Sequence, residues 1–455
     1  MRDTLRVQLW PLPTLGVALA VVAGVALPRL DERLHDGFPP WLRDYLFGGS
    51  SDAARAVLAA IAGSLITVTA LTFSLTVLTL QLASSQFSPR VLRTFNADRY
   101  VRTTLSIFLA TFTYALTVLR TVRTGEDERT GFVPALSITV AFLLTLASLL
   151  ALVLFLSHLA REIRVETLMT SVHSSADRTV RRLLKEGQDT AHGDSAGAPS
   201  SGVPEPPADA LPLSIGVSGF LTSVDEAALL RAAVDADAVL LIDRHPGSSL
   251  IAATPVGAAW PRMQEPFSPE ARSRLAGDIR ETVHTGPERT GRQDIAFGLR
   301  QLTDIAVKAL SPGINDPTTA VHALSHSAAL LCELAQHDLG PRLLRDDDRR
   351  VRVVLRRPDL ADLLDLAVAQ PLRYGAAEPA VLERVATLLR ELAWCTTPDR
   401  HPPIVAALAR LRSTIDERDR HATEYSRLTG LTRLVDEALA GRWGHGRIHG
   451  RTVDP

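Results

Sequence analysis

The sequence predicts a membrane protein with four transmembrane helices, followed by a cytoplasmic α+β region that is mostly helical with a small mixed sheet. Two observations predict this fold class. Apolar residues crowd into the first third of the 455-residue chain, in four runs that approach or exceed the roughly 20 residues needed to cross a hydrocarbon core about 30 Å thick. Beyond the last run, a Gly-, Ser- and Pro-rich stretch leads to a segment with strand and helix periodicity.

The predicted transmembrane domain covers residues 1–160. Its four spans lie at about residues 10–28, 53–82, 104–122 and 133–160. The first run follows Arg2 and Arg6 and could instead be a cleaved signal peptide. Three more spans follow, however, and the run is long for a signal, so four spans are the economical interpretation.

The distribution of Arg predicts the orientation in the membrane. Arg residues are frequent before the first span, between the second and third spans, and after the fourth span. Because short Arg-rich loops stay in the cytoplasm, we expect both termini to be cytoplasmic. The Arg- and Ala-rich composition is typical of a high-GC bacterial genome. Cys332 and Cys395 then lie in a reducing compartment, and we expect no disulfide.

The second span is unusual because it combines high apolarity with many Ser and Thr residues. One ridge, spaced by seven residues, contains Thr67, Ser74, Gln81 and Ser88, and a second contains Thr72, Thr79 and Gln86. A ridge of this kind could line a water-filled path. Alternatively, it could let helices approach closely, as small residues commonly do in membrane bundles. A single such helix cannot enclose a channel, so a pore would require a homo-oligomer.

The cytoplasmic region is expected to have five parts. These are a basic juxtamembrane helix at 161–185, a flexible linker at 186–210, a small α/β module at 211–260, a helical domain at 261–440 and a tail at 441–455. Within the helical domain, one helix is expected at 293–310. A lone strand is expected at 350–355.

The stretch 288–326 holds the second concentration of polar residues. Asn315 and Asp316 precede Pro317, which predicts a helix N-cap followed by proline at the first helical position. His322 and His326 are four residues apart, but the H-E-x-x-H pattern of a zinc site is absent, so we expect no metal. Catalytic and phosphate-binding motifs are also absent, which disfavours an enzyme and gives no cofactor. The formal charge of −1 disfavours a nucleic-acid partner.

These residues also resemble a known family. The string QFSPR at 86–90, after a Ser/Thr-rich span, and the string RTxxQDxxFGxRQLxDIAxKALSPGINDPTTA at 289–320 resemble the bacterial membrane proteins of the domain-of-unknown-function 2254 family. The resemblance implies a multi-pass inner-membrane protein with a cytoplasmic C-terminal region. It brings no established reaction, ligand or catalytic residue. Its polar and turn positions, of unknown role, are Arg289, Gln293, Asp294, Arg300, Gln301, Asp304, Lys308, Asn315, Asp316 and Pro317.

Two functions remain open from sequence alone. The first is a homo-oligomer in the lipid bilayer whose second helices line a passage for ions or small polar solutes, under the control of the cytoplasmic region. The second is a membrane-anchored sensor or interaction protein of unknown ligand, in which the Ser/Thr ridge only packs subunits together. An enzyme acting at 289–326 is the third and least favoured interpretation.

Overall fold

The structure is a computed structural model that describes residues 11–34, 46–86, 99–123, 133–162, 165–189, 204–263, 265–418 and 421–443. The chain divides into two compact units, Met1–Thr167 and Leu168–Pro455. Each unit is described by itself.

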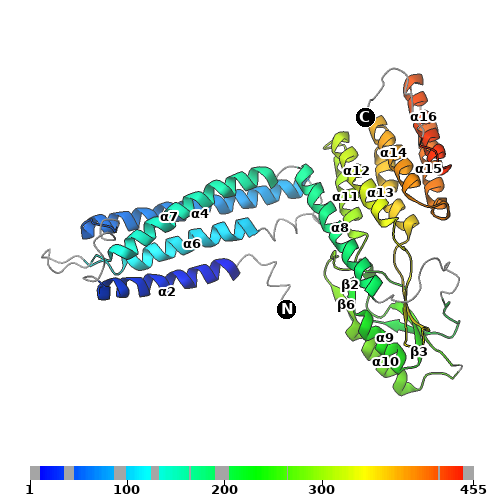
Figure 1. Ribbon diagram of the computed structural model, residues 1–455, viewed down its shortest axis with the longest axis horizontal. Coiled ribbons are helices and arrows are strands. Elements are labelled where there is room, and N and C mark those ends of the chain that lie inside the picture. The colour runs from blue at the N-terminus through cyan, green and yellow to red at the C-terminus, as the bar shows by residue number, and fades with distance from the viewer. Residues whose placement is uncertain are drawn as a thin grey trace. The chain divides into compact units, whose positions relative to one another are not determined.

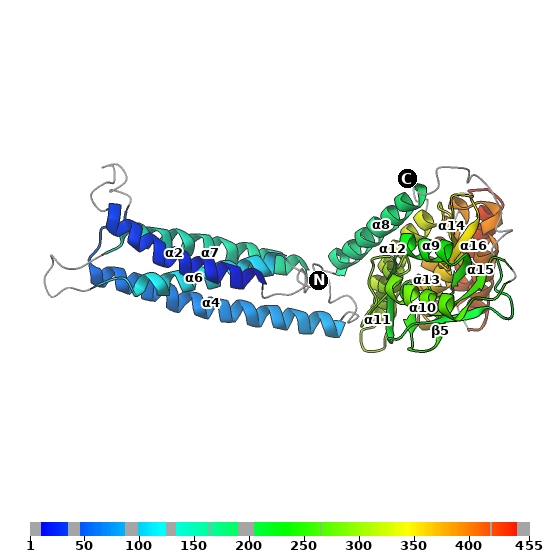
Figure 2. The same ribbon diagram turned by 90° about the horizontal axis from the view of Figure 1, so that it is seen from below.

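The first unit is a bundle of long helices, which run alongside one another in Figures 1 and 2. They are α2 (Pro11–Leu34), α4 (Ser51–Gln86), α6 (Arg99–Leu119) and α7 (Ala135–Glu162). All four are long and apolar enough to cross a membrane. The predicted fold class is confirmed, although α4 extends beyond the expected end of the second span and α6 begins before the expected start of the third.

Helix α6 packs against each of the other three helices of the bundle. Two glycines of α2 let it approach closely: a Cβ added at Gly16 would lie 2.5 Å from the Ser106 hydroxyl, and one added at Gly24 would lie 2.8 Å from the Thr117 Cβ. Helices in a bilayer gain little from hydrophobic burial against one another, so close packing of small residues is a main source of their association. The bundle is therefore held by van der Waals contact along α6.

Polar groups inside the bundle have partners. The hydroxyls of Thr111 on α6 and Ser148 on α7 lie 3.1 Å apart and are buried. Tyr114 donates its hydroxyl to the Ser137 carbonyl oxygen at 3.0 Å, and the Ser137 amide donates to the buried Asp31 carboxylate at 3.1 Å. The first two bonds join α6 to α7 and the third joins α2 to α7, in a medium that offers no water to unpaired groups.

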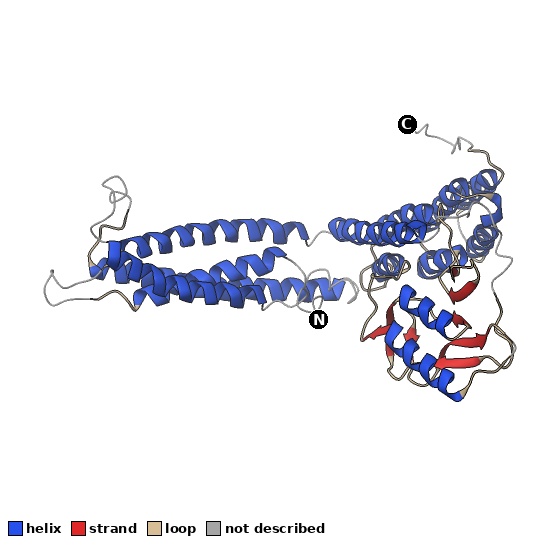
Figure 3. Cartoon of the chain, turned by 60° about the horizontal axis from the view of Figure 1, so that its bottom comes forward, coloured by secondary structure: helices blue, strands red, loops and turns tan. Residues whose placement is uncertain are grey.

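The second unit combines two small sheets with a set of packed helices (Figure 3). Its first part contains α8 (Val165–Asp189), β1 (Leu211–Ser214), β2 (Gly219–Val224), α9 (Glu226–Asp235), β3 (Ala238–Ile242), β4 (Ser249–Leu250), β5 (Pro255–Pro261), α10 (Pro269–Thr282) and β6 (Val283–Gly286). Its second part contains α11 (Phe297–Ala309), α12 (Pro317–Leu334), β7 (Arg342–Arg345), β8 (Val351–Leu355), α13 (Leu360–Tyr374), α14 (Pro379–Cys395), the short helix η1 (Pro398–Arg400), α15 (Pro402–Asp416) and α16 (Ala422–Leu439).

The sheet topology corrects one expectation. A five-stranded sheet has the order β1-β5-β3-β8-β7, and a three-stranded sheet has the order β4-β2-β6. The strand expected to stand alone at 350–355 is β8, which pairs in parallel with β3 and antiparallel with β7. The five-stranded sheet therefore includes strands from beyond the predicted 211–260 module. β8, which lies between α12 and α13 in the chain, pairs with the edge of β3 that β5 leaves open.

A second correction concerns the start of α11. The helix expected from residue 293 begins at Phe297. The residues before it form a turn in which the Asp294 carboxylate accepts a hydrogen bond from the Ala296 amide at 3.1 Å. Asp competes in this way with helical hydrogen bonding, so the helix starts after the turn.

Candidate functional site

Three of the predicted ridge positions lie on the outward surface of α4. Thr67, Ser74 and Gln81 are exposed, and they share one face with other exposed residues at intervals of three and four positions, which are all small except Val77. We call this face the α4 stripe, and all its members are exposed: Ala56, Ala60, Gly63, Thr67, Ala70, Ser74, Val77 and Gln81. Such spacing forms a continuous seam along a helix.

The outward faces of two other helices in the bundle have a different composition. The exposed large residues of α2 include Leu15, Leu19 and Val22, and those of α7 include Leu149, Leu150 and Val153. Bulky aliphatic side chains of this kind suit contact with lipid tails. The α4 stripe consists mainly of small side chains and is flanked by exposed Leu71 and Leu78.

The second predicted ridge lies inside the subunit. Thr72 and Thr79 are buried, at 1% and 7% exposure. Gln86 is the last residue of α4, and its side chain lies outside the described residues, as does the whole of Ser88. Of the two ridges, the first therefore faces outward from the subunit and the second packs within it.

Several α4 hydroxyls bond to the helix backbone. Thr67 donates to the Gly63 carbonyl at 3.1 Å, and Thr79 donates to the Leu75 carbonyl at 2.8 Å. Thr69 and Thr76 bond to the carbonyl four residues earlier in the same way. Because these bonds satisfy the hydroxyl hydrogens locally, threonine costs little in an apolar environment. Polarity alone therefore does not show that this face contacts water.

The motif segment, residues 289–320, begins with a buried ion pair. Arg289 donates two hydrogen bonds to one oxygen of Asp294, at 3.0 and 2.7 Å, and the Asp294 side chain is only 1% exposed. Gly247, with φ +93°, lies directly against the pair, since an added Cβ would be 2.2 Å from Asp294 Oδ2. The pair thus fixes the turn at 245–247 against the start of the motif segment.

Gln293 attaches the same segment to the smaller sheet. Its side-chain oxygen accepts from the Val224 amide at 2.8 Å, and its side-chain nitrogen donates to the Val224 carbonyl at 3.1 Å. Val224 is the last residue of β2. The amide of Gln293 therefore takes the place of a neighbouring strand at that position, which is a structural role.

Helix α8 packs against the motif segment from the other side. Thr179 donates to the Gly291 carbonyl at 2.9 Å, and Arg182 donates to the Arg292 carbonyl at 2.7 Å. The closest approach lies at Gly298 of α11, where an added Cβ would be 2.3 Å from the Ala176 Cβ. The first half of the motif segment is thus the docking surface for α8.

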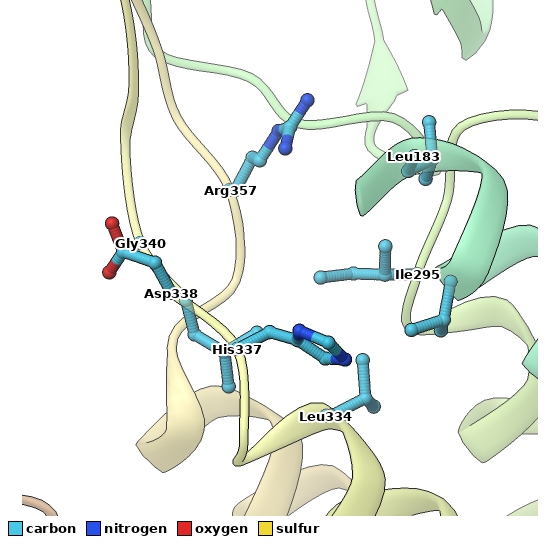
Figure 4. A pocket seen from close by; sticks show the side chains of 9 residues that line it. Leu183, Ile295, Leu334, His337, Asp338, Gly340 and Arg357 are labelled. Atoms are coloured by element: carbon cyan, nitrogen blue, oxygen red, sulfur yellow. The ribbon is translucent and has the colours of Figure 1, made fainter. Parts of the chain in front are cut away.

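Apolar side chains fill the rest of this contact. Val180 and Leu183 of α8 are buried, and with Ile295 and Leu334 they line a small cavity. Figure 4 shows Leu183, Ile295, Leu334 and His337 around this space. His337, Asp338 and Arg357 complete the lining together with Leu339 and Gly340. The space measures about 20 Å³, which is about the room of a single water molecule, so it suits helix packing better than a ligand.

The second half of the motif segment forms α11 and the cap of α12. Asp316 accepts a hydrogen bond from the Thr319 amide at 3.0 Å, and Pro317 is the first helical residue, so the cap prediction is confirmed. Hydrogen bonds from Thr319 lower the pKa of Asp316. Asn315 occupies the left-handed turn before the cap, with φ +50°. On α11, Gln301 is buried, and the remaining motif positions are half-buried, namely Arg300, Asp304 and Lys308.

Sequence reasoning missed a group of titratable side chains between α8 and α12. The rings of His173 and His326 lie 5.4 Å apart, centroid to centroid. Arg181 contacts Asp177 at 2.8 Å and Glu333 at 3.3 Å. The available signal was the four-residue spacing of His173, Asp177 and Arg181, which places them on one helix face.

Comparison with known proteins decides the family. The family model described as "Predicted membrane protein (DUF2254)" matches residues 6–391. The chain belongs to the DUF2254 family. Its relatives include uncharacterized proteins of Mycobacterium bovis and Mycobacterium tuberculosis, each 36% identical over 425 residues, which cover 92% of this chain and 79% of the relative. No solved structure matches the chain. The resemblance seen in the sequence is confirmed, and this DUF2254 protein is a membrane protein of its family.

Proposed function

We propose that this DUF2254 protein assembles in the bacterial inner membrane as a homo-oligomer through the α4 stripe, and that its α4 helices surround a narrow passage for ions or small polar solutes. One observation carries the proposal. Among the outward faces of the bundle, the α4 stripe combines small and polar residues where α2 and α7 present bulky aliphatic ones. A second copy of the chain fits such a face, because small residues let two helix backbones approach closely.

Gln81 gives a second reason to expect that the α4 stripe contacts water or another copy of the chain. Its side chain is exposed near the end of the apolar part of α4. An amide has four hydrogen-bonding sites, which hydrocarbon leaves unsatisfied at a cost of several kcal/mol. A neighbouring copy or water would satisfy them. In a symmetric ring, the Gln81 side chains of all copies would lie at the same height along the symmetry axis.

The spacing of the ridge suggests how a passage would be lined. Thr67, Ser74 and Gln81 are seven residues apart, which corresponds to about 10.5 Å along a helix. In a ring of copies they would form successive polar rings separated by small apolar residues such as Ala70. None of the stripe residues is ionised, so the passage would lack a charged selectivity ring.

The proposed passage is under the control of the cytoplasmic unit. Helix α8 begins at Val165, shortly after α7 ends at Glu162, and it packs on the motif segment. The proposal contains no catalytic step, cofactor, metal or nucleic acid, since Arg289, Gln293 and Asp294 of the motif segment are hydrogen-bonded within the fold. It places both termini in the cytoplasm. A periplasm-active reporter fused after Glu126 is then expected to be active, and activity of a fusion after Gly187 would contradict this orientation.

Thiol accessibility and flux test the passage. Single-cysteine variants Thr67→Cys, Ser74→Cys and Gln81→Cys, in a Cys332→Ala, Cys395→Ala background, are expected to react with a small charged thiol reagent in liposomes. Leu71→Cys and Leu78→Cys are the matched controls and are expected to react more slowly. Ser74→Leu is expected to reduce ion flux, because a ring of apolar side chains excludes water.

The second candidate is a membrane-anchored sensor whose stripe only packs copies together. The backbone-bonded threonine hydroxyls favour it, because they need no water. It predicts protected thiols along the stripe and no current through reconstituted protein. That pair of results would overturn the passage and leave the oligomer.

A further inference from the structure

The contact between α8 and α12 places two carboxyl groups beside one cation. Asp177 and Glu333 lie within hydrogen-bonding reach of each other. Arg181 contacts both, through Nε to Asp177 Oδ1 at 2.8 Å and through Nη2 to Glu333 Oε1 at 3.3 Å. The carboxyl side chains are 25% and 24% exposed, whereas Arg181 is 66% exposed. The two acids are therefore better shielded from water than the cation between them.

This geometry favours one bound proton. If both carboxyls were ionised, two negative charges would face each other with one solvent-screened positive charge to offset them. Two carboxylates that share a site raise the proton affinity of one of them, and the proton belongs to the pair. A shared proton also forms the hydrogen bond that joins the two helices.

We propose that Asp177 and Glu333 form a proton-binding site whose shared proton holds α8 against α12, so that α8 docks less tightly once the proton leaves. The inference concerns the packing of α8 and stands whether or not α4 lines a passage. Since α8 follows α7 closely in the chain, the site would report cytoplasmic pH to the last membrane span.

The pH at which the site acts follows from the environment of Glu333. Burial, followed by the hydrogen bond and charge of Asp177, raises the pKa of Glu333 to about 7, while Arg181 opposes the shift. Hydrogen bonds from Glu333 and Arg181 lower the pKa of Asp177. When α8 is undocked, Glu333 returns toward an ordinary value of about 4.3. The docked state then binds more protons between these two values, so the contribution of the carboxyl pair to docking is largest at low pH, is lost as pH rises through about 7, and changes little above that.

The neighbouring histidines act in the opposite direction. His326 faces His173 on α8 and His322 on its own helix, and burial followed by these two neighbours lowers its pKa. The Nδ1 atom of His173 is buried without a hydrogen-bond partner in the part of the chain that the structure describes. Protonation of His326 would add charge to a half-buried ring, so its contribution to docking weakens below the ordinary pKa of histidine.

His337 is a further titratable group beside the site. It faces Arg181 on α8 and Arg400 at η1, and burial followed by these two charges lowers its pKa. His337 therefore also binds its proton only at a pH below the ordinary pKa of histidine. The change near pH 7 belongs to the carboxyl pair.

The test measures how well docking protects a buried position of α8 in the full-length protein. In the Cys332→Ala, Cys395→Ala background, Val180→Cys places a thiol at a position that is 1% exposed, and Ser175→Cys supplies an exposed control on the same helix. The ratio of their reaction rates with a neutral maleimide reports undocking and cancels the pH dependence of the thiol itself. Between pH 6.5 and 8 the ratio is expected to rise roughly threefold.

Three variants assign this rise to the carboxyl pair. Glu333→Gln keeps the shape and hydrogen-bonding capacity of the protonated acid, so the rise should vanish while protection persists at pH 8. Asp177→Asn should also flatten it, and gives the same answer if the first variant folds poorly. His326→Gln should keep the rise. A ratio that is constant in the parent protein, or a rise that survives in Glu333→Gln, would overturn the proposal.

Discussion

The α4 stripe and the motif segment use polar residues in opposite ways. In the motif segment, Asp294 is buried against Arg289, and Gln293 bonds both backbone groups of Val224. On the α4 stripe, Ser74 and Gln81 face outward from the subunit. The motif segment is the more recognisable string in the sequence, yet most of its identified contacts are internal.

The residues that identify the family therefore differ from the residues that are available to contact lipid, water or another copy of the chain. A polar side chain that is hydrogen-bonded inside its own subunit stabilises the fold and has few remaining hydrogen-bonding groups for a ligand. A polar or small side chain on an outward helix face has to meet lipid, water or another copy. Substitutions of individual residues test this difference.

The largest effect is expected at the buried ion pair. Asp294→Ala would leave the Arg289 guanidinium without its bidentate partner beneath the 245–247 turn, which costs roughly 3–5 kcal/mol when a buried pair is broken. The measurement is denaturant unfolding of the full-length protein in detergent, followed by tryptophan fluorescence. Asp347→Ala removes an exposed acid and is expected to change stability by less than about 0.5 kcal/mol. Equal effects of the two variants would contradict a structural role for Asp294.

A smaller effect is expected where α8 meets the motif segment. Gly298→Ala would place a methyl group 2.3 Å from the Ala176 Cβ, and overpacking of this kind costs about 1–3 kcal/mol. Ala176→Gly in the same chain removes the opposing methyl group and should restore part of the lost stability. The double-mutant cycle is measured by the same unfolding experiment. Additive effects would show that the two residues do not touch.

The smallest effect is expected at the cap of α12. Replacing both Asn315 and Asp316 by Ala removes the acceptor for the Thr319 amide, which costs about 1–2 kcal/mol. Passage and oligomer size should stay unchanged, because the cap belongs to the second unit and the α4 stripe to the first. A variant that keeps its melting temperature but loses flux would show that this turn is a functional site.

The sequence predicted those features that depend on local composition. The four spans could be found because each helix must satisfy its own backbone and cover its own length of bilayer. The Asp316 cap could be found because capping involves residues three positions apart. The helical character of the C-terminal region follows from periodicity in the same way. Most of the predicted linker at 186–210 lies outside the described residues.

Features that depend on distant residues could not be predicted. Thr67 and Thr72 have similar chemistry, and only packing against other helices decides that one is exposed and the other buried. The pairing of β8 with β3 joins strands far apart in the chain. The contact of Asp177 with Glu333 likewise joins a segment that reads as a basic juxtamembrane helix to the face of α12.

The central claim is that the α4 stripe meets the same stripe of another copy, and disulfide cross-linking tests it most directly. Ser74→Cys, in a Cys332→Ala, Cys395→Ala background in liposomes, is expected to form covalent dimers rapidly with a mild oxidant, because in a symmetric ring the equivalent positions of all copies lie at one level around the narrow central axis. Val153→Cys, on the outward face of α7 and 60% exposed, is the matched control and should stay monomeric. Dimers formed no faster by Ser74→Cys than by Val153→Cys would contradict the account.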